Sequence, residues 1–244
     1  MEHLLTQSQQ TGGFYNFSNI RYAAPPLGNL RFAAPQPPAV NRSEVQTGSV
    51  GRICPQAGPA WGTTAAQFVA SYLQGIPFNG TASNSSSNAT SALPRQDPRT
   101  TEDCLFLDVV VPRQVLESAG MGYGAPVMVW IYGGGYTFGD KSGINGGSPA
   151  GLIRRGNESV IYVAMNYRLG AFGWLSGPTF QANGTANAGL LDQRLALDWI
   201  KAYIPLFGGD PNRITVFGES AGGGSIMHHI TVSEYRADGE RCSC

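Results

Sequence analysis

The segment Ile214-Thr-Val-Phe-Gly-Glu-Ser-Ala-Gly222 combines a short apolar run, a G-x-S-x-G pentapeptide and the start of a helical stretch. This pattern predicts a strand, a sharp turn and a helix, with the Ser220 hydroxyl projecting from strained backbone at the end of the strand. Gly218 and Gly222 flank the serine because side chains there would clash with the neighbouring strand and helix. Backbone N–H groups at the start of the helix would face an anion formed near Ser220. Ser220 is therefore the candidate nucleophile.

The pentapeptide alone is a weak signal in a chain with 33 glycines. It gains meaning only because an apolar strand precedes it and a helix follows it. An ordinary glycine-rich turn between strand and helix is the alternative.

Longer apolar runs lie upstream of this segment and predict further strands. Uninterrupted apolar runs suit strands that are covered on both faces, as in a parallel sheet. The predicted strands are residues 105–111, 126–132, 159–166 and 214–217.

Helices are predicted between and after these strands. Leu191, Leu195, Trp199 and Tyr203 recur at four-residue spacing in residues 188–204, with Ile200 and Ile204 beside them, and predict one apolar stripe. A second helix is predicted from Ala221 to Ile230, and a short one near residues 65–73. Residues 1–50 are rich in proline and predict extended, irregular backbone. Alternating strands and helices indicate an α/β fold with a mostly parallel sheet and flanking helices.

A second glycine run, Gly133-Gly-Gly135, follows the predicted strand at residues 126–132. If Ser220 attacks the carbonyl of an ester, the tetrahedral oxyanion that forms needs hydrogen-bond donors. The Ala221 N–H is one candidate, and this side-chain-free loop is the expected source of the others. A nucleotide-binding loop is the alternative, but the G-x-G-x-x-G spacing fails at Phe138.

The four cysteines give a partial signal. A bridge between Cys54 and Cys104 would close a long polar loop, and two unrelated buried thiols are the alternative. The terminal Cys242 and Cys244 have no metal-ligand spacing and no partner histidines. No metal or other cofactor is expected.

Several blocks of the chain resemble the type-B carboxylesterase, lipase and cholinesterase family. The resemblance covers about residues 14–231, and Tyr132 before the triple glycine is similar to the lipase and cholinesterase branches. The matching blocks are residues 21–32, 102–112, 166–170, 189–194 and 207–222.

This resemblance implies an α/β-hydrolase fold and a serine carboxylic-ester hydrolase that acts through an acyl-enzyme on small-molecule or lipid esters. It implies that Ser220 is the nucleophile, with Glu219 near the site. It also implies an oxyanion hole, a Cys54–Cys104 disulfide and two structural ion pairs. The hole would use the N–H groups of Gly134, Gly135 and Ala221, and the ion pairs would join Arg31 to Glu102 and Arg168 to Asp192.

Composition limits the partners and the location. The 16 basic and 16 acidic side chains balance, so nothing indicates binding to nucleic acid or an anionic membrane. No apolar run approaches the ~20 residues of a transmembrane span. The N-terminus does not resemble a signal peptide. Glycosylation sequons nevertheless favour a secreted glycoprotein whose leader is missing; they begin at Asn16, Asn41, Asn79, Asn84, Asn88, Asn157 and Asn183. The oligomeric state is open.

The remainder of a catalytic triad is not evident. In α/β-hydrolases the acid and then the histidine follow the serine, yet residues after Ser220 end at Cys244. His228 lies about 12 Å along the helix axis from Ser220, and a base must come within about 3.2 Å. His229 shares this helix, and His3 precedes the serine. Glu234, Asp238 and Glu240 lie in a tail that departs from the family pattern.

We therefore expect residues 1–244 to be a partial α/β-hydrolase domain, truncated after the nucleophile helix, and nearly inert alone. A non-catalytic adhesion or binding module and a non-functional truncated product are the alternatives.

Overall fold

The computed structural model describes residues 9–11, 13–40, 43, 46–58, 61–78, 97–142 and 149–232. The chain forms two compact units. One comprises residues up to Gln56 together with those from Arg99 onward, and the other spans Ala57–Pro98. All of the predicted site residues belong to the first unit.

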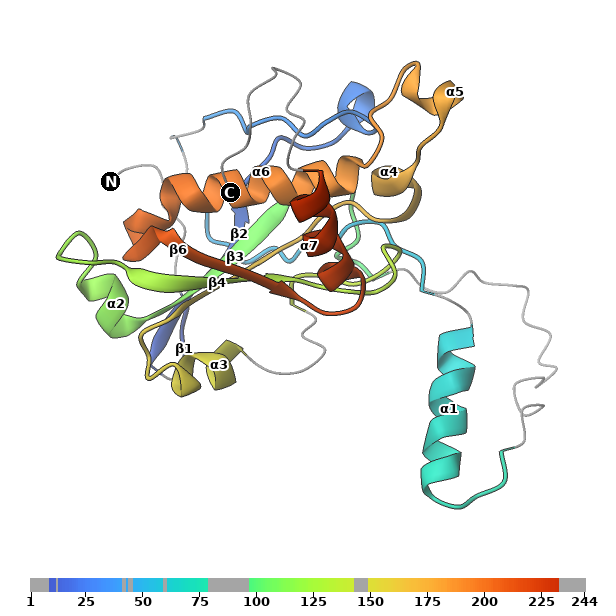
Figure 1. The fold of residues 1–244 in the computed structure, drawn as a ribbon, viewed down its shortest axis with the longest axis horizontal. Helices are drawn as coiled ribbons and strands as arrows, with labels where there is room; N and C mark the ends of the chain where they lie inside the picture. The colour runs from blue at the N-terminus through green and yellow to red at the C-terminus, as the bar shows by residue number, and fades with distance from the viewer. Residues whose placement is uncertain are drawn as a thin grey trace. The chain divides into compact units, whose positions relative to one another are not determined.

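A mixed sheet organises the first unit (Figure 1). Its order is β1-β2-β3-β5-β4-β6. β5, β4 and β6 run parallel, whereas β3 is antiparallel to both β5 and β2. β2, β4, β5 and β6 therefore point the same way, which confirms a mostly parallel sheet. The strands are β1 (Gln9–Thr11), β2 (Phe14–Arg21), β3 (Phe106–Pro112), β4 (Ala125–Ile131), β5 (Ile161–Met165) and β6 (Gly209–Gly218).

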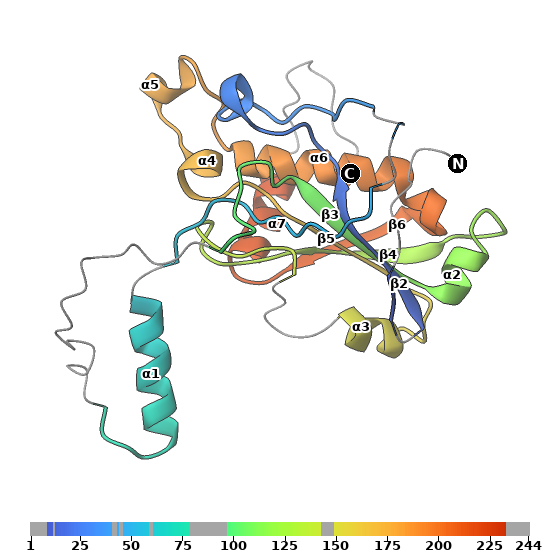
Figure 2. The same cartoon turned by 180° about the vertical axis from the view of Figure 1, so that it is seen from behind.

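The helices alternate with the strands as predicted. Figures 1 and 2 show α6 along one face of the sheet and α3 at the other. In the first unit the helical segments are η1 (Gly28–Leu30), α2 (Arg113–Glu117), α3 (Pro149–Arg155), α4 (Gly170–Trp174), α5 (Pro178–Gln181), α6 (Ala188–Tyr203), η2 (Ile204–Phe207) and α7 (Ala221–Thr231). The predicted helices at residues 188–204 and 221–230 are thus confirmed.

The prediction of irregular backbone throughout residues 1–50 was wrong for β1 and β2. β2 alternates in the manner of a strand: Tyr15 and Phe17 face one side and Asn16 the other, as their partners on β3 show. The dense prolines further along obscured this period. β6 also begins at Gly209, earlier than the predicted Ile214. Gly209 pairs with Ala125 of β4, and a register shift separates this pair from the pairing of Ile214 with Val127.

Apolar side chains pack on both faces of the central strands. Val109, Val163, Val129 and Val216 lie in one register row across β3, β5, β4 and β6. The next strand, β2, adds Phe17 to this row, and its ring meets Phe207 just after α6 at 5.0 Å. On the opposite face Trp130 and Phe217 are neighbours, with ring centroids 5.0 Å apart. All five residues of β5 are buried, as the uninterrupted apolar runs predicted.

The apolar stripe predicted for α6 is displaced in the structure. Leu191 and Leu195 are only half-buried and Tyr203 is 41% exposed. Trp199, Ile200 and Ile204 of the predicted stripe are buried, and Asp192, Gln193 and Ala196 join them on the buried face. Hydrogen bonds and an ion pair made by Asp192 and Gln193 account for the rotation, since those polar groups could be buried only with partners.

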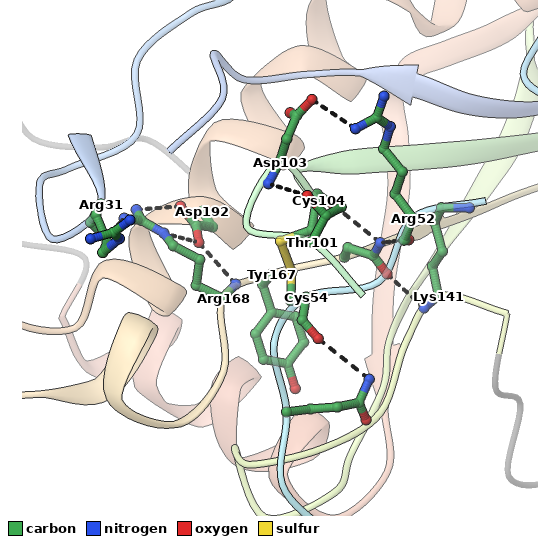
Figure 3. Close-up of a disulfide and its surroundings, with 12 residues drawn as sticks. Arg31, Arg52, Cys54, Thr101, Asp103, Cys104, Lys141, Tyr167, Arg168 and Asp192 are labelled. Carbon is green, nitrogen blue, oxygen red and sulfur yellow. Dashed lines mark hydrogen bonds and ion pairs between the residues drawn. A yellow bond between two sulfur atoms is a disulfide. The ribbon is translucent and has the colours of Figure 1, made fainter. Parts of the chain in front are cut away.

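The disulfide and both ion pairs implied by the resemblance are present. Figure 3 shows the disulfide and the Arg168–Asp192 pair. Cys54 and Cys104 are bonded across a sequence separation of 50, a loop closure worth about 4 kcal/mol in the entropic model. Arg31 binds Glu102, with Nη2 2.9 Å from Oε1.

The Arg168–Asp192 pair is completely enclosed. Arg168 Nε and Nη2 donate to the two Asp192 oxygens at 2.8 and 2.7 Å, and the Arg168 backbone N–H adds a third bond. Arg168 Nη1 donates to the Arg31 carbonyl. Burial raises the pKa of Asp192, and Arg168 opposes that shift. Loss of either partner would leave a buried charge unpaired.

The second unit is described by itself. Its helix α1 (Trp61–Leu73) confirms and extends the helix predicted near residues 65–73. Phe68 stacks on Tyr72 and meets Phe78 edge-on. The sequons at Asn79, Asn84 and Asn88 lie outside the described residues, as does Asn41.

A chain of side-chain hydrogen bonds joins α6 to α7. Gln193 Nε2 donates to Ser225 Oγ at 3.0 Å, and Gln193 Oε1 lies 2.9 Å from His229 Nε2. Arg194 Nε donates to His229 Nδ1 at 3.3 Å. Because Nδ1 accepts this bond, the remaining proton of a neutral His229 belongs on Nε2, where it is donated to Gln193. The set is fully satisfied only while the imidazole is neutral.

The pH dependence of stability follows from this arrangement. Burial, followed by the charges of Arg194 and His228, lowers the pKa of His229 from 6.5 to about 4. The unfolded chain therefore takes up a proton first as pH falls, and stability present above pH 6.5 is lost between 6.5 and 4. We expect the stability difference between wild type and His229→Gln to shrink over this range, measured by denaturant titration. His228→Gln, at an exposed neighbour, removes only the smallest of these contributions and should keep most of the pH dependence. If the difference in the free energy of unfolding between wild type and His229→Gln stays constant from pH 7 to pH 4, the assignment is contradicted.

Candidate active site

The candidate nucleophile lies on a sharp turn between β6 and α7. Ser220 has φ 53° and ψ −122°, a combination rarely adopted by a residue with a side chain. Its side chain is exposed, and its hydroxyl does not cap the helix. The turn is held by bonds from the Gly222 N–H to the Glu219 carbonyl and from the Gly224 N–H to the Ser220 carbonyl. The strained strand–turn–helix geometry is confirmed.

The flanking glycines are required by close packing. A Cβ on Gly222 would lie 2.0 Å from the carbonyl oxygen of Ile131, and one on Gly218 would lie 2.6 Å from the Gly222 carbonyl carbon. Ile131 is the last residue of β4, the strand beside β6. The predicted clash with the neighbouring strand and helix is therefore confirmed, and the contact is backbone against backbone.

The triple glycine lies against this turn. A Cβ on Gly133 would meet the Glu219 carbonyl oxygen at 2.6 Å and Ser220 Cβ at 3.0 Å. Since β4 and β6 are adjacent and parallel, the segments that follow them emerge at the same edge of the sheet. The pairing of loop and turn, predicted from separate parts of the sequence, is thus present in the fold.

Backbone donors lie free around this junction. Gly134 and Gly135 have φ of 110° and 60°, and the space where a Gly135 side chain would be is open. Neither glycine N–H donates a backbone hydrogen bond to another described residue. As the first residue of α7, Ala221 has no intrahelical acceptor for its N–H. The N–H groups of Gly134, Gly135 and Ala221 thus have no backbone acceptor among the described residues.

The remaining candidates have less specific surroundings. Glu219 is exposed, and its carboxylate lies beside Gly133. His228 is exposed on α7, whereas His229 is engaged by Gln193 and Arg194. Within the described ranges, no three His, Cys, Asp or Glu side chains could together hold a metal. Some sequence candidates lie outside the described residues, namely His3, Glu234, Asp238, Glu240, Cys242 and Cys244.

The sequence analysis missed one residue of this site, Tyr136. It follows the triple glycine with φ 62°, and its ring lies 4.1 Å from that of Trp174. Its hydroxyl reaches the first turn of α7 at Gly224. The position directly after the glycine run was the only available signal, because nothing in the local sequence predicts a left-handed aromatic residue.

The glycine contacts predict opposite effects at neighbouring positions of α7. Gly222→Ala would force a methyl group onto the Ile131 carbonyl, with an expected loss of about 1–3 kcal/mol in the free energy of unfolding. Gly223→Ala is the matched control, because its Cβ would meet nothing closer than 3.4 Å. There the gain in helix propensity, up to about 1 kcal/mol, should prevail. Denaturant titration of both variants distinguishes them, and equal effects would contradict the packing.

Comparison with known proteins places the chain in a family. The profile of the Carboxylesterase family matches residues 4–239. The chain is similar to Carboxylesterase patB of Aspergillus clavatus, with 47% identity over 242 residues, 94% of this chain and 43% of that protein. It is 46% identical over 145 residues to a Secreted lipase of Arthroderma benhamiae, covering 57% of this chain and 28% of that protein.

Solved structures agree with this result. Aspergillus niger EstA superposes with a TM-score of 0.71 and 32% identity, over 96% of this chain and 38% of that one. The predicted α/β-hydrolase fold is thereby confirmed. The chain spans about two-fifths of the length of the patB relatives that it matches. None of the described helices is both long and apolar enough to cross a bilayer. This chain belongs to the carboxylesterase family.

Proposed function

We propose that this chain provides the nucleophile and the oxyanion hole of a serine carboxylic-ester hydrolase. Ser220 is the nucleophile, and the N–H groups of Gly134, Gly135 and Ala221 bind the oxyanion. The observation that carries the proposal is the contact of Gly133 with the strained Ser220 turn. It brings an exposed hydroxyl and free backbone donors together at one edge of the sheet.

The chemistry follows from these positions. The Ser220 hydroxyl attacks an ester carbonyl, and the developing oxyanion accepts hydrogen bonds from preorganised backbone donors. Collapse of the tetrahedral intermediate expels the alcohol and leaves an acyl group on Ser220. Water then releases the carboxylic acid. Donors fixed by the fold need no reorganisation during the reaction, which is why such groups contribute strongly to catalysis.

The general base is proposed to come from outside the described residues. His228 is separated from Ser220 by about two turns of α7, and His229 is committed to its contacts with α6. We accordingly propose that the described residues, without such a base, would hydrolyse esters only weakly, since removal of triad members leaves small residual catalysis.

Substrate class and location are parts of the same proposal. The relatives are named carboxylesterases and lipases, so the substrate is proposed to be a small-molecule or lipid ester. We propose that the protein is secreted, as the name of one relative says of that protein. Its sequons at Asn157 and Asn183 are exposed and could carry glycans.

Substitution of the nucleophile provides the direct test. The protein should hydrolyse a short-chain p-nitrophenyl ester, and Ser220→Ala should lower kcat by about 10⁴-fold or more. A fluorophosphonate should add mass to the peptide that contains Ser220. Ser176→Ala, at an exposed serine between α4 and α5, is the control and should retain wild-type kcat. Undiminished hydrolysis by Ser220→Ala would overturn the proposal.

A further inference from the structure

We propose that Tyr136 and Gly224 form a steric lock that sets the separation between the glycine loop and α7. The lock would thereby position the Gly134 and Gly135 N–H groups relative to that of Ala221. Tyr136 is then a positioning residue for the oxyanion hole. The inference rests on the proposed ester hydrolysis at Ser220.

The contact itself is close and specific. A Cβ on Gly224 would lie 2.5 Å from the Tyr136 hydroxyl oxygen and 3.7 Å from Cζ. Apart from the backbone of α7 and the adjoining residues, no other described atom comes within 4 Å of that position. A hydroxyl group therefore occupies the space that any side chain at position 224 would need.

The loop side of the lock is firmly supported. The Tyr136 carbonyl accepts the Gly170 N–H at 2.7 Å, and its ring packs on Trp174. Trp174 Nε1 donates in turn to the Arg168 carbonyl at 3.1 Å. Arg168 is held by its buried ion pair with Asp192 on α6.

On the α7 side of the lock, the support comes from Gln193, the residue of α6 that follows Asp192. Ser225, adjacent to Gly224, accepts the hydrogen bond from Gln193. Consecutive residues of α6, Asp192 and Gln193, thus anchor the two surfaces that meet at the lock. Movement of either surface would strain a buried ion pair or a buried hydrogen bond. The Tyr136–Gly224 contact therefore keeps the glycine loop and α7 at a fixed separation.

The backbone of Tyr136 gives an independent indication. A left-handed φ in an aromatic residue costs of order 1–3 kcal/mol and persists only where the surroundings impose it. The ring of Trp174 and the hydrogen bond from the Gly170 N–H to the Tyr136 carbonyl hold this residue in place. Such outliers concentrate at sites where a fixed geometry serves function.

A pair of variants tests the lock. Gly224→Ala should push the Tyr136 hydroxyl and the glycine loop away from α7, lowering kcat by about tenfold or more while KM changes little. Tyr136→Phe removes the obstructing oxygen and leaves Cζ at an ordinary contact distance of 3.7 Å. In the Gly224→Ala/Tyr136→Phe double variant kcat should return to within about threefold of Tyr136→Phe alone. Gly223→Ala is the control for adding a methyl group to α7.

The outcomes separate the lock from the proposed function. Wild-type kcat in Gly224→Ala, or a loss that Tyr136→Phe does not rescue, would overturn the lock while Ser220 stays essential. Hydrolysis that survives Ser220→Ala would overturn the proposed function instead. If Gly224→Ala folds poorly, the midpoint of thermal unfolding is measured instead. The lock predicts a higher midpoint for the Gly224→Ala/Tyr136→Phe double variant than for Gly224→Ala alone. An equal or lower midpoint would contradict the lock.

Discussion

Backbone-to-backbone contact between two chain segments is the constraint on which the candidate site depends. The end of β4 and the loop after it touch the turn after β6 without intervening side chains, at Gly133 and at Gly222. Any side chain at these positions would separate the segments by the size of a methyl group or more. An oxyanion hole built from both segments tolerates no such separation, because hydrogen bonds weaken rapidly beyond about 3.2 Å.

The rest of the fold maintains this contact. The parallel pairing of β4 with β6 brings the two segments to the same sheet edge. α6 then supports them from the side: Asp192 holds the segment after β5 through Arg168, and Gln193 holds α7 through Ser225. Buried polar residues on α6 therefore fix the orientation of the elements around the site, in place of the simple apolar stripe expected of a helix on a sheet.

Much of this site could be predicted from sequence because backbone chemistry restricts it. Only glycine fits at positions 133, 218 and 222, so the glycine pattern itself carries the geometry. The ion pairs and the disulfide were implied by resemblance rather than by spacing. The burial of Gln193 and the left-handed Tyr136 could not be predicted, since both depend on side chains distant in sequence. The β2 strand was missed because nearby prolines masked its alternation.

Packing holds Ser220 in a backbone conformation that this residue would not otherwise adopt. Comparing the free energies of unfolding of Ser220→Gly and Ser220→Ala by denaturant titration tests this directly, since both lack the hydroxyl and only glycine accepts φ 53° without strain. We expect the glycine variant to be more stable than the alanine variant by about 1 kcal/mol, because the backbone strain that glycine relieves exceeds the entropic cost of glycine. Equal stability, or a more stable alanine variant, would contradict it.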